Sequence, residues 1–120
     1  MFAEVKDMLP VSGDAYDAQI ITEIKACCLD LTTSAEITLP GDVNITRTQV
    51  TTTAETYWVI TDASTLTDEL AITVIATWCN MRIGNPPNYD NLLKAYESLK
   101  GQLRLSKKYT DYEGGANGCG

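Results

Sequence analysis

The chain has 120 residues, of which 44% are hydrophobic and 21% are charged. This fits one small globular domain and excludes a charge-rich disordered chain. Sixteen acidic side chains against nine basic ones give a net charge of −7, which disfavours a protein whose task is to neutralise nucleic-acid phosphates. Because the sequence has neither a secretory signal nor an apolar run of ~20 residues, we expect a protein made in the cytoplasm with no membrane partner.

Two helices are predicted in the first third of the chain. Residues 2–9 have apolar side chains at helical spacing, and Pro10 ends the helix. Asp14 is a suitable amino-terminal cap for a second helix, from Ala15 to about Thr33. Steps of three and four predict one buried stripe on the second helix, made of Tyr16, Ile20, Ile24, Cys27 and Leu31.

A Thr-rich segment follows, at about residues 36–58, in which β-branched residues alternate with polar ones. This pattern favours a β-hairpin, which we place within Ile37 to Val50 around a turn at Pro40-Gly41-Asp42. A Thr-rich loop is the alternative, because a short isolated hairpin is only marginally stable in water. Either form would project from the helices and suit contacts with a partner or a neighbouring copy.

Two further helices are predicted after this segment. Residues 66–83 are nearly all apolar in the middle, so this helix is the best candidate for the centre of the core. Gly84 and Asn85 end it, and two prolines prevent its continuation. Asn88 then caps a last helix, from Tyr89 to about Ser106. Its apolar seam predicts packing along the whole helix and consists of Tyr89, Leu92, Tyr96, Leu99 and Leu103.

Together these elements predict a mainly α fold, a small bundle of about four helices. A Thr-rich hairpin or loop is inserted at about residues 36–58, between the second and third helices. We expect residues 1–106 to form one domain and residues 107–120, which end in a glycine-rich stretch, to form a flexible tail.

The chemistry-bearing residues do not indicate an enzyme. The chain has no histidine, which removes histidine-based triads and zinc sites that need histidine. The four cysteines, which lack CxxC spacing, are Cys27, Cys28, Cys79 and Cys119. The carboxylate pairs, Asp14 with Asp17 and Asp68 with Glu69, stand at predicted helix starts, where acidic side chains stabilise the helix dipole. We therefore expect no catalytic residue, no cofactor and no metal.

Charge is distributed unevenly along the chain. Residues 1–81 carry three basic and twelve acidic side chains, whereas residues 82–108 carry six basic and two acidic ones. The basic set is Arg82, Lys94, Lys100, Arg104, Lys107 and Lys108. A basic last helix that met the acidic surface of a neighbouring copy would orient subunits in an oligomer. A solvated helix face is the alternative, because Lys and Arg favour the carboxyl end of a helix.

Several strings in a fixed order carry a family resemblance. They are Trp58–Leu70 (WVITDASTLTDEL), Arg82–Tyr89 (RIGNPPNY), Leu92–Leu105 (LLKAYESLKGQLRL), Lys108–Tyr112 (KYTDY) and, near the start, Glu4–Leu9 and Gly13–Asp17. Over about residues 3–112 this combination resembles the head-tail connector proteins of long-tailed double-stranded-DNA bacteriophages. These proteins are also called adaptor, head-completion or DNA-packaging proteins.

The resemblance implies a structural protein of the virion neck. Its partners would be the portal protein, a stopper or tail-completion protein, and further copies of itself in a ring of about twelve. The ring would extend the channel for double-stranded DNA, without sequence-specific binding, and an acidic subunit suits such a channel. The resemblance also assigns portal contact to the segment after the last helix, here Lys107, Lys108, Tyr109, Thr110, Asp111 and Tyr112.

Contacts between copies are expected to use aromatic side chains, which are frequent at protein interfaces, and basic side chains that meet the acidic surface of a neighbour. The candidates are Tyr57, Trp58, Arg82, Lys100 and Arg104. For Trp58, closure of the monomer's own core is the alternative role.

A second function fits the same composition, namely a host or prophage helical adaptor or regulator that binds a protein partner through the hairpin or the last helix. A helix-turn-helix DNA reader is disfavoured. The last helix begins Tyr89-Asp90-Asn91 and has no arginine in its first turn, where base-reading side chains would stand.

Overall fold

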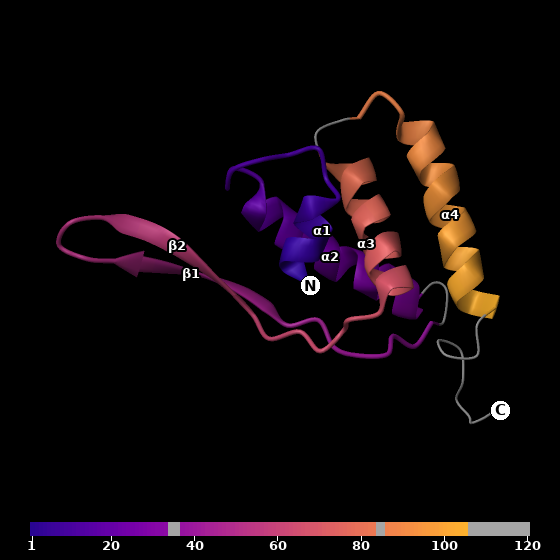
Figure 1. The fold of residues 1–120 in the computed structure, drawn as a ribbon, viewed down its shortest axis with the longest axis horizontal. Coiled ribbons are helices and arrows are strands. Elements are labelled where there is room, and N and C mark those ends of the chain that lie inside the picture. The colour runs from indigo at the N-terminus through magenta and orange to yellow at the C-terminus, as the bar shows by residue number, and fades with distance from the viewer. Residues whose placement is uncertain (34–36, 84–85, 106–120) are drawn as a thin grey trace.

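The structure is a computed structural model that describes residues 1–33, 37–83 and 86–105. It shows a helical body with one projecting hairpin (Figure 1). The elements are α1 (Phe2–Asp7), α2 (Asp17–Thr33), β1 (Ile45–Thr51), β2 (Thr56–Asp62), α3 (Glu69–Arg82) and α4 (Tyr89–Leu105). Four helices with a two-stranded antiparallel hairpin between α2 and α3 confirm the predicted fold class.

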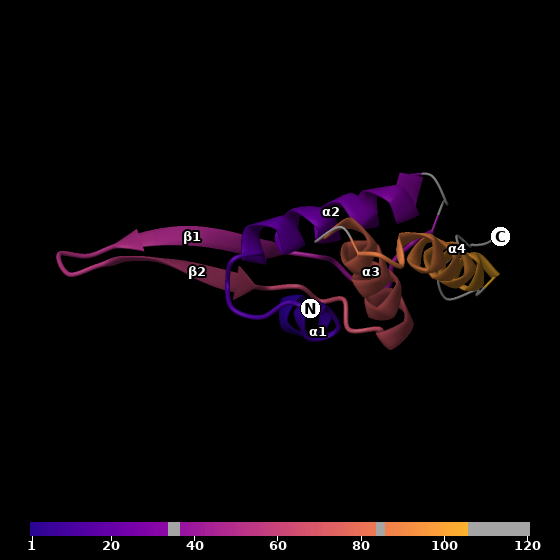
Figure 2. The ribbon, with the colours of Figure 1, turned by 90° about the horizontal axis from the view of Figure 1, so that it is seen from above.

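Helix α3 is the centre of the body, as its apolar composition predicts. It packs on α1, α2 and α4, and α1 and α2 lie on opposite sides of the body (Figure 2). The helix begins three residues after the predicted start at Leu66. The cap is Asp68, whose carboxylate Oδ2 accepts a hydrogen bond from the Ala71 N–H at 3.1 Å. Asp68 has the extended backbone of a cap, so Leu66 lies outside the helix, where its N–H donates to the carbonyl of Asp42 at 3.1 Å.

Helix α2 buries most of the predicted stripe. Its fully buried members are Ile20, Ile24, Cys27 and Leu31. Tyr16 is exposed, because it precedes the first residue of the helix, Asp17. The predicted cap, Asp14, contributes its backbone carbonyl, which accepts a hydrogen bond from the Asp17 N–H at 3.2 Å. The Asp17 carboxylate instead pairs with the Lys6 ammonium at 2.7 Å and ties α2 to α1.

Helix α4 packs on α3 through the predicted seam. Tyr96 and Leu103 are buried, and Leu92 and Leu99 are half-buried. Tyr89, at the start of the helix, is exposed. The predicted helix stop at residues 84–85 and the predicted tail at residues 107–120 lie outside the described residues.

The hairpin exists, but its predicted position is wrong. Ile45 pairs with Asp62 and Thr51 with Thr56, so the strands occupy residues 45–62 and the turn lies at residues 52–55. The Thr52 hydroxyl closes this turn, since its Oγ1 accepts hydrogen bonds from the N–H groups of Ala54 and Glu55 at 3.2 and 3.1 Å. None of these four residues is Gly, Pro, Asn or Asp, so the usual turn signals do not mark the turn.

The first part of the segment predicted to form the hairpin, residues 37–44, lies along the body instead, and only residues 45–50 belong to the observed hairpin. Ile37 is buried, and Leu39 and Val43 pack against the core. The alternation of apolar and polar residues therefore reflects an extended segment with one buried side. Between these residues, Gly41 runs against the backbone at Leu66.

Replacing Gly41 by alanine is expected to lower the free energy of unfolding by about 1–3 kcal/mol. An added Cβ would lie only 2.7 Å from the backbone N and Cα atoms of Leu66. Urea unfolding followed by circular dichroism measures the loss. Gly101→Ala is the matched control, since a Cβ there meets nothing within 4 Å. Because alanine favours a helix, this control should gain about 0.5–1 kcal/mol. Unchanged stability of Gly41→Ala would contradict the close approach.

Candidate functional site

The hairpin formed by residues 45–62, here called the arm, carries the exposed aromatic residues. Side chains alternate between the two faces of a strand pair. On the first face the Arg47 guanidinium lies 3.8 Å from the centroid of the Trp58 ring, a cation–π contact. Ile60 pairs with Arg47 across the strands. Ile45 lies on the same face and is buried in the core. Trp58 itself is 49% exposed, so the alternative that it closes the monomer's core is wrong.

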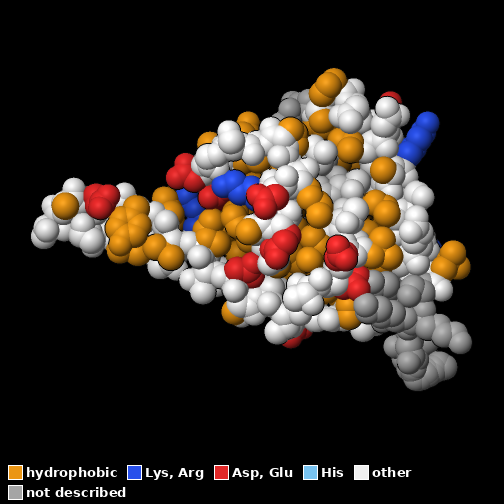
Figure 3. Space-filling view, viewed as in Figure 1, with side chains coloured by type: hydrophobic (Ala, Val, Ile, Leu, Met, Phe, Trp, Pro, Cys, Tyr) orange, Lys and Arg blue, Asp and Glu red, His pale blue; other side chains and the backbone are white. Residues whose placement is uncertain are grey.

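The second face of the arm carries Tyr57 and Val59. Tyr57 pairs with Val50 and Val59 with Thr48 across the two strands. Both Tyr57 and Val59 are exposed, and hydrophobic side chains are visible along the arm in Figure 3. Tyr57 and Trp58, the two aromatic interface candidates, thus lie on opposite faces of a projecting element.

Polar contacts to α1 hold the root of the arm. The Phe2 N–H donates to the Asp62 Oδ2 at 2.7 Å, and the Ser64 N–H donates to the Oδ1 at 3.1 Å. Burial alone would raise the pKa of the Asp62 carboxyl, but these hydrogen bonds outweigh burial and hold the pKa well below its ordinary value. Asp62 is therefore a carboxylate at neutral pH and fixes where the arm leaves the body.

Lys100, a third interface candidate, is engaged inside the subunit. Its ammonium lies 3.3 Å from the Asp30 carboxylate on α2. The Tyr96 hydroxyl donates to the same carboxylate oxygen at 2.6 Å, and the Lys100 ammonium lies 5.1 Å from the centroid of the Tyr96 ring. Arg104, one turn further along α4, is exposed and is the candidate cation on this helix that faces solvent.

Arg82 repeats this arrangement one helix earlier. The Trp78 Nε1–H donates to the Glu23 Oε1 on α2 at 3.0 Å, and the Arg82 Nε lies 3.6 Å from that oxygen. The guanidinium lies 4.8 Å from the centroid of the Trp78 ring. In both cases an aromatic donor and a cation four residues later share one carboxylate of α2. The (i, i+4) spacing of aromatic and cation is the sequence signal that marks these contacts.

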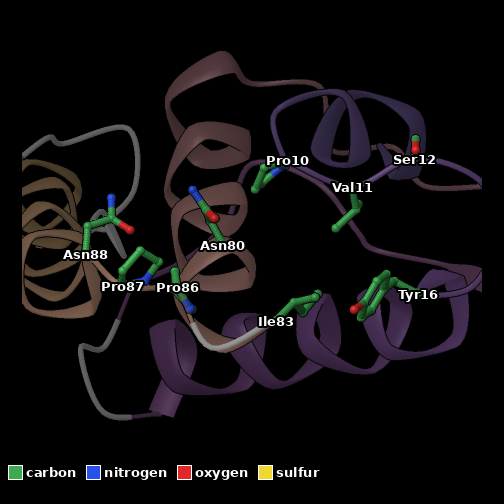
Figure 4. Close-up of a pocket in the computed structure, with 9 residues that line it drawn as sticks. All are labelled: Pro10, Val11, Ser12, Tyr16, Asn80, Ile83, Pro86, Pro87 and Asn88. Carbon is green, nitrogen blue, oxygen red and sulfur yellow. The ribbon is translucent and has the colours of Figure 1, made fainter.

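A cleft that the sequence does not predict lies at the end of the body where α3 ends. It has a volume of about 550 Å³ and is lined by Pro10, Val11, Ser12, Tyr16, Asn80, Ile83, Pro86, Pro87 and Asn88. Figure 4 shows Val11, Tyr16 and Ile83 around the same space, from three different segments. Among these lining residues Tyr16 is the only titratable one, so the cleft offers no acid–base pair. The sequence feature that accompanies the cleft is proline in two connections, Pro10 between α1 and α2 and Pro86 and Pro87 between α3 and α4.

The thiols of the described residues are poor nucleophiles. Cys27 and Cys79 are buried and Cys28 is half-buried. Burial raises the pKa of Cys79 to about 12 and that of Cys28 to about 11, and it raises the pKa of Cys27 further. All three are protonated at neutral pH, and the thiolate is the reactive form of cysteine.

Within residues 1–33, 37–83 and 86–105, no group of three or more metal-ligating side chains is close enough to hold an ion. No helix in this part of the chain is long and apolar enough to cross a membrane. The predicted portal-binding residues, 107–112, lie outside it.

Comparison with known proteins gives one match. A family model described as phage connector protein matches residues 1–110, which confirms the family resemblance. No curated protein and no solved structure matches the chain significantly.

Lys100→Gln is expected to lower the free energy of unfolding by about 1–2 kcal/mol, because it removes the cation from a hydrogen-bonded carboxylate. Arg104→Gln, on the exposed side of the same helix, is the control and should stay within about 0.5 kcal/mol of the parent protein. Urea unfolding compares the two variants. Equal losses would contradict the inward role of Lys100.

Alkaline pH is expected to destabilise the fold through the buried thiols. In the unfolded chain they ionise near the ordinary pKa of 9.0, whereas in the folded chain their raised pKa keeps them protonated. The unfolded state therefore loses protons first, and stability falls as pH rises above 9. Each thiol contributes a loss of about 1.4 kcal/mol at pH 10.

Urea unfolding between pH 8 and pH 10, in a Cys119→Ser background, measures this slope. Cys28→Ala should remove one thiol's share of the slope, and it disturbs packing less than a change at Cys27 or Cys79 because Cys28 is half-buried and those two are buried. An unchanged slope in Cys28→Ala would show that this thiol ionises equally in both states.

Proposed function

The chain belongs to the phage connector protein family, and we propose that it forms a ring beneath the portal. In this proposal the ring extends the DNA channel and joins the head to the stopper or tail-completion protein in the virion neck. Family membership makes the chain a structural phage protein with a non-enzymatic role. The observation that carries the proposal is the match over residues 1–110, which spans the body and the arm.

The shape of the subunit supports a ring. A ring forms when two different surfaces of identical subunits meet repeatedly around an axis. The described part of the chain has two chemically different ends, with exposed aromatic side chains on the arm and exposed cations on α4 (Figure 1). A ring of about a dozen copies would use both ends of every subunit.

Electrostatics support a channel for DNA. Each phosphate that Lys or Arg neutralises adds to a salt-dependent affinity, so a channel wall that holds DNA loosely needs few free cations. The chain has a net charge of −7, and acidic side chains are spread over the body in Figure 3. Lys100 and Arg82 are directed to carboxylates of their own subunit, which leaves fewer cations for phosphate.

Residues 107–112 would supply the portal contact. They include two lysines and two tyrosines within six positions, which combines charge with the aromatic side chains typical of interface anchors. They directly follow α4, which ends at Leu105.

Electron microscopy of the purified protein tests the proposal, both alone and mixed with DNA-filled, portal-containing heads of the phage that encodes it. We expect a ring at the portal vertex. No ring at high protein concentration, together with no binding to filled heads, would overturn the proposal.

Deletion of residues 107–120 is expected to abolish attachment to heads while the helical circular dichroism stays unchanged. The four helices of the described residues end by Leu105, so the deletion removes none of them. Sedimentation of protein with heads measures attachment. Deletion of residues 113–120 alone is the matched control and should retain attachment, because it keeps both tyrosines. Loss of helical signal in the longer deletion would show instead that the segment is needed for folding.

A further inference from the structure

We infer that the arm of one subunit docks on α4 of a second copy of this chain. The arm contributes the face that carries Tyr57 and Val59. The helix contributes the flank that carries Tyr89 and Leu93. The inference rests on the proposed function and deepens it, because it names the surfaces that would join neighbouring subunits of the ring.

The arm face is apolar and uncovered. Tyr57 is 43% exposed and Val59 is 39% exposed. They lie on the same side of the strand pair as their partners Val50 and Thr48. The opposite face is occupied by the stacked pair of Arg47 and Trp58. Tyr57, Val59 and Val50 therefore form a separate apolar surface, with Thr48 beside it.

The arm also lacks support along its length. Ile45 is buried and Ile60 packs against the core, but no residue from Thr46 to Asp62 is fully buried. A two-stranded hairpin is at best marginally stable by itself in water. Packing of one face on another protein surface would supply the apolar contact that the subunit does not.

Helix α4 offers a matching surface. Its inner side packs on α3 through Tyr96 and Leu103, which are buried. Tyr89 and Leu93 are four residues apart, so they lie next to each other along one flank. They are 42% and 38% exposed, which leaves an uncovered apolar flank on α4.

The placement of the two surfaces makes the contact intermolecular. The arm and α4 lie at opposite ends of the described structure in both ribbon views (Figures 1 and 2), so an arm cannot reach the α4 of its own subunit. Because the two surfaces differ, the contact is heterologous, and such contacts close into a ring when the rotation between subunits allows it.

Charges beside the two surfaces are complementary. Glu55 stands in the arm turn, close to Tyr57 in sequence, and Lys94 follows Leu93 on α4; both side chains are exposed. Opposite charges favour this pairing over contacts between two arms or two α4 helices.

Complementation between two variants tests the inference. The arm variant is Tyr57→Ser with Val59→Thr, and the helix variant is Tyr89→Gln with Leu93→Gln. All four side chains are partly exposed, so the helical circular dichroism should match that of the parent protein. Leu29→Gln is the control, because Leu29 is an exposed apolar residue of α2 outside both surfaces.

Each variant alone is expected to reduce ring formation about tenfold or more, on heads and in concentrated solution, whereas the control assembles normally. An equal mixture should form dimers, because the intact arm of the helix variant can dock on the intact α4 of the arm variant. Normal assembly by either variant, or no dimers in the mixture, would overturn the inference.

A photo-crosslinker at Val59, introduced as p-benzoylphenylalanine, separates this inference from the proposed function. Cross-linked peptides from concentrated protein should join residue 59 to residues 89–105 of a second copy, with or without heads. A cross-link between two arms, or none between copies, would overturn the inference while head binding by the parent protein still supports the connector role. Absence of head binding together with the expected cross-link would overturn the connector role alone.

Discussion

Helix α3 must be covered over most of its surface, and the rest of the fold follows from this requirement. Every residue from Leu70 to Met81 is buried or half-buried, and the side that reaches water is a narrow polar stripe made of Thr73, Thr77 and Asn80. In a chain of 120 residues, α1, α2 and α4 are used to cover it, and little apolar sequence remains for a second core. The arm consequently extends outside the body, and its aromatic side chains stay uncovered in the single subunit.

Two similar polar contacts fix the position of α2 relative to α3 and α4. Glu23 accepts from Trp78 on α3 and Asp30 accepts from Tyr96 on α4. In each case a cation four residues after the aromatic lies near the same carboxylate and over the ring. Both carboxylates are half-buried, and leaving them without partners would cost free energy, so a shifted helix register that separated these groups is disfavoured. The contacts therefore add specificity to an otherwise apolar and non-directional packing.

The helices could be predicted from the sequence because their information is local. Steps of three and four mark the buried side of α2 and the seam of α4, and the errors at the helix starts are only a few residues. The arm was misplaced because its turn is closed by the Thr52 hydroxyl and contains no typical turn residue. Pro40 and Gly41 do mark a bend, but the bend serves a close approach to Leu66, which is distant in sequence.

For the interface candidates, the sequence does not show which charged side chains are paired within the subunit. Counting charges identified a basic last helix, but a count cannot show that Lys100 is directed to Asp30 while Arg104 faces solvent. That division depends on which side of α4 meets α2, and hence on packing between residues about 70 positions apart. For Trp58, an apolar residue, the sequence leaves a core role and a surface role open. The strand register and the exposed fraction of the side chain place it on the surface of the arm.

A projecting arm has a thermodynamic consequence for assembly in the proposed ring. A two-stranded hairpin is only marginally stable by itself, so docking of one of its faces must also order the arm. This cost offsets part of the free energy of association, and the contact between two subunits is weak. Two free subunits would then associate weakly. Subunits held side by side on a portal face one another at a high effective concentration, so the same modest contacts become sufficient. In the proposed ring, an arm outside the core thus favours assembly at the portal over assembly in free solution.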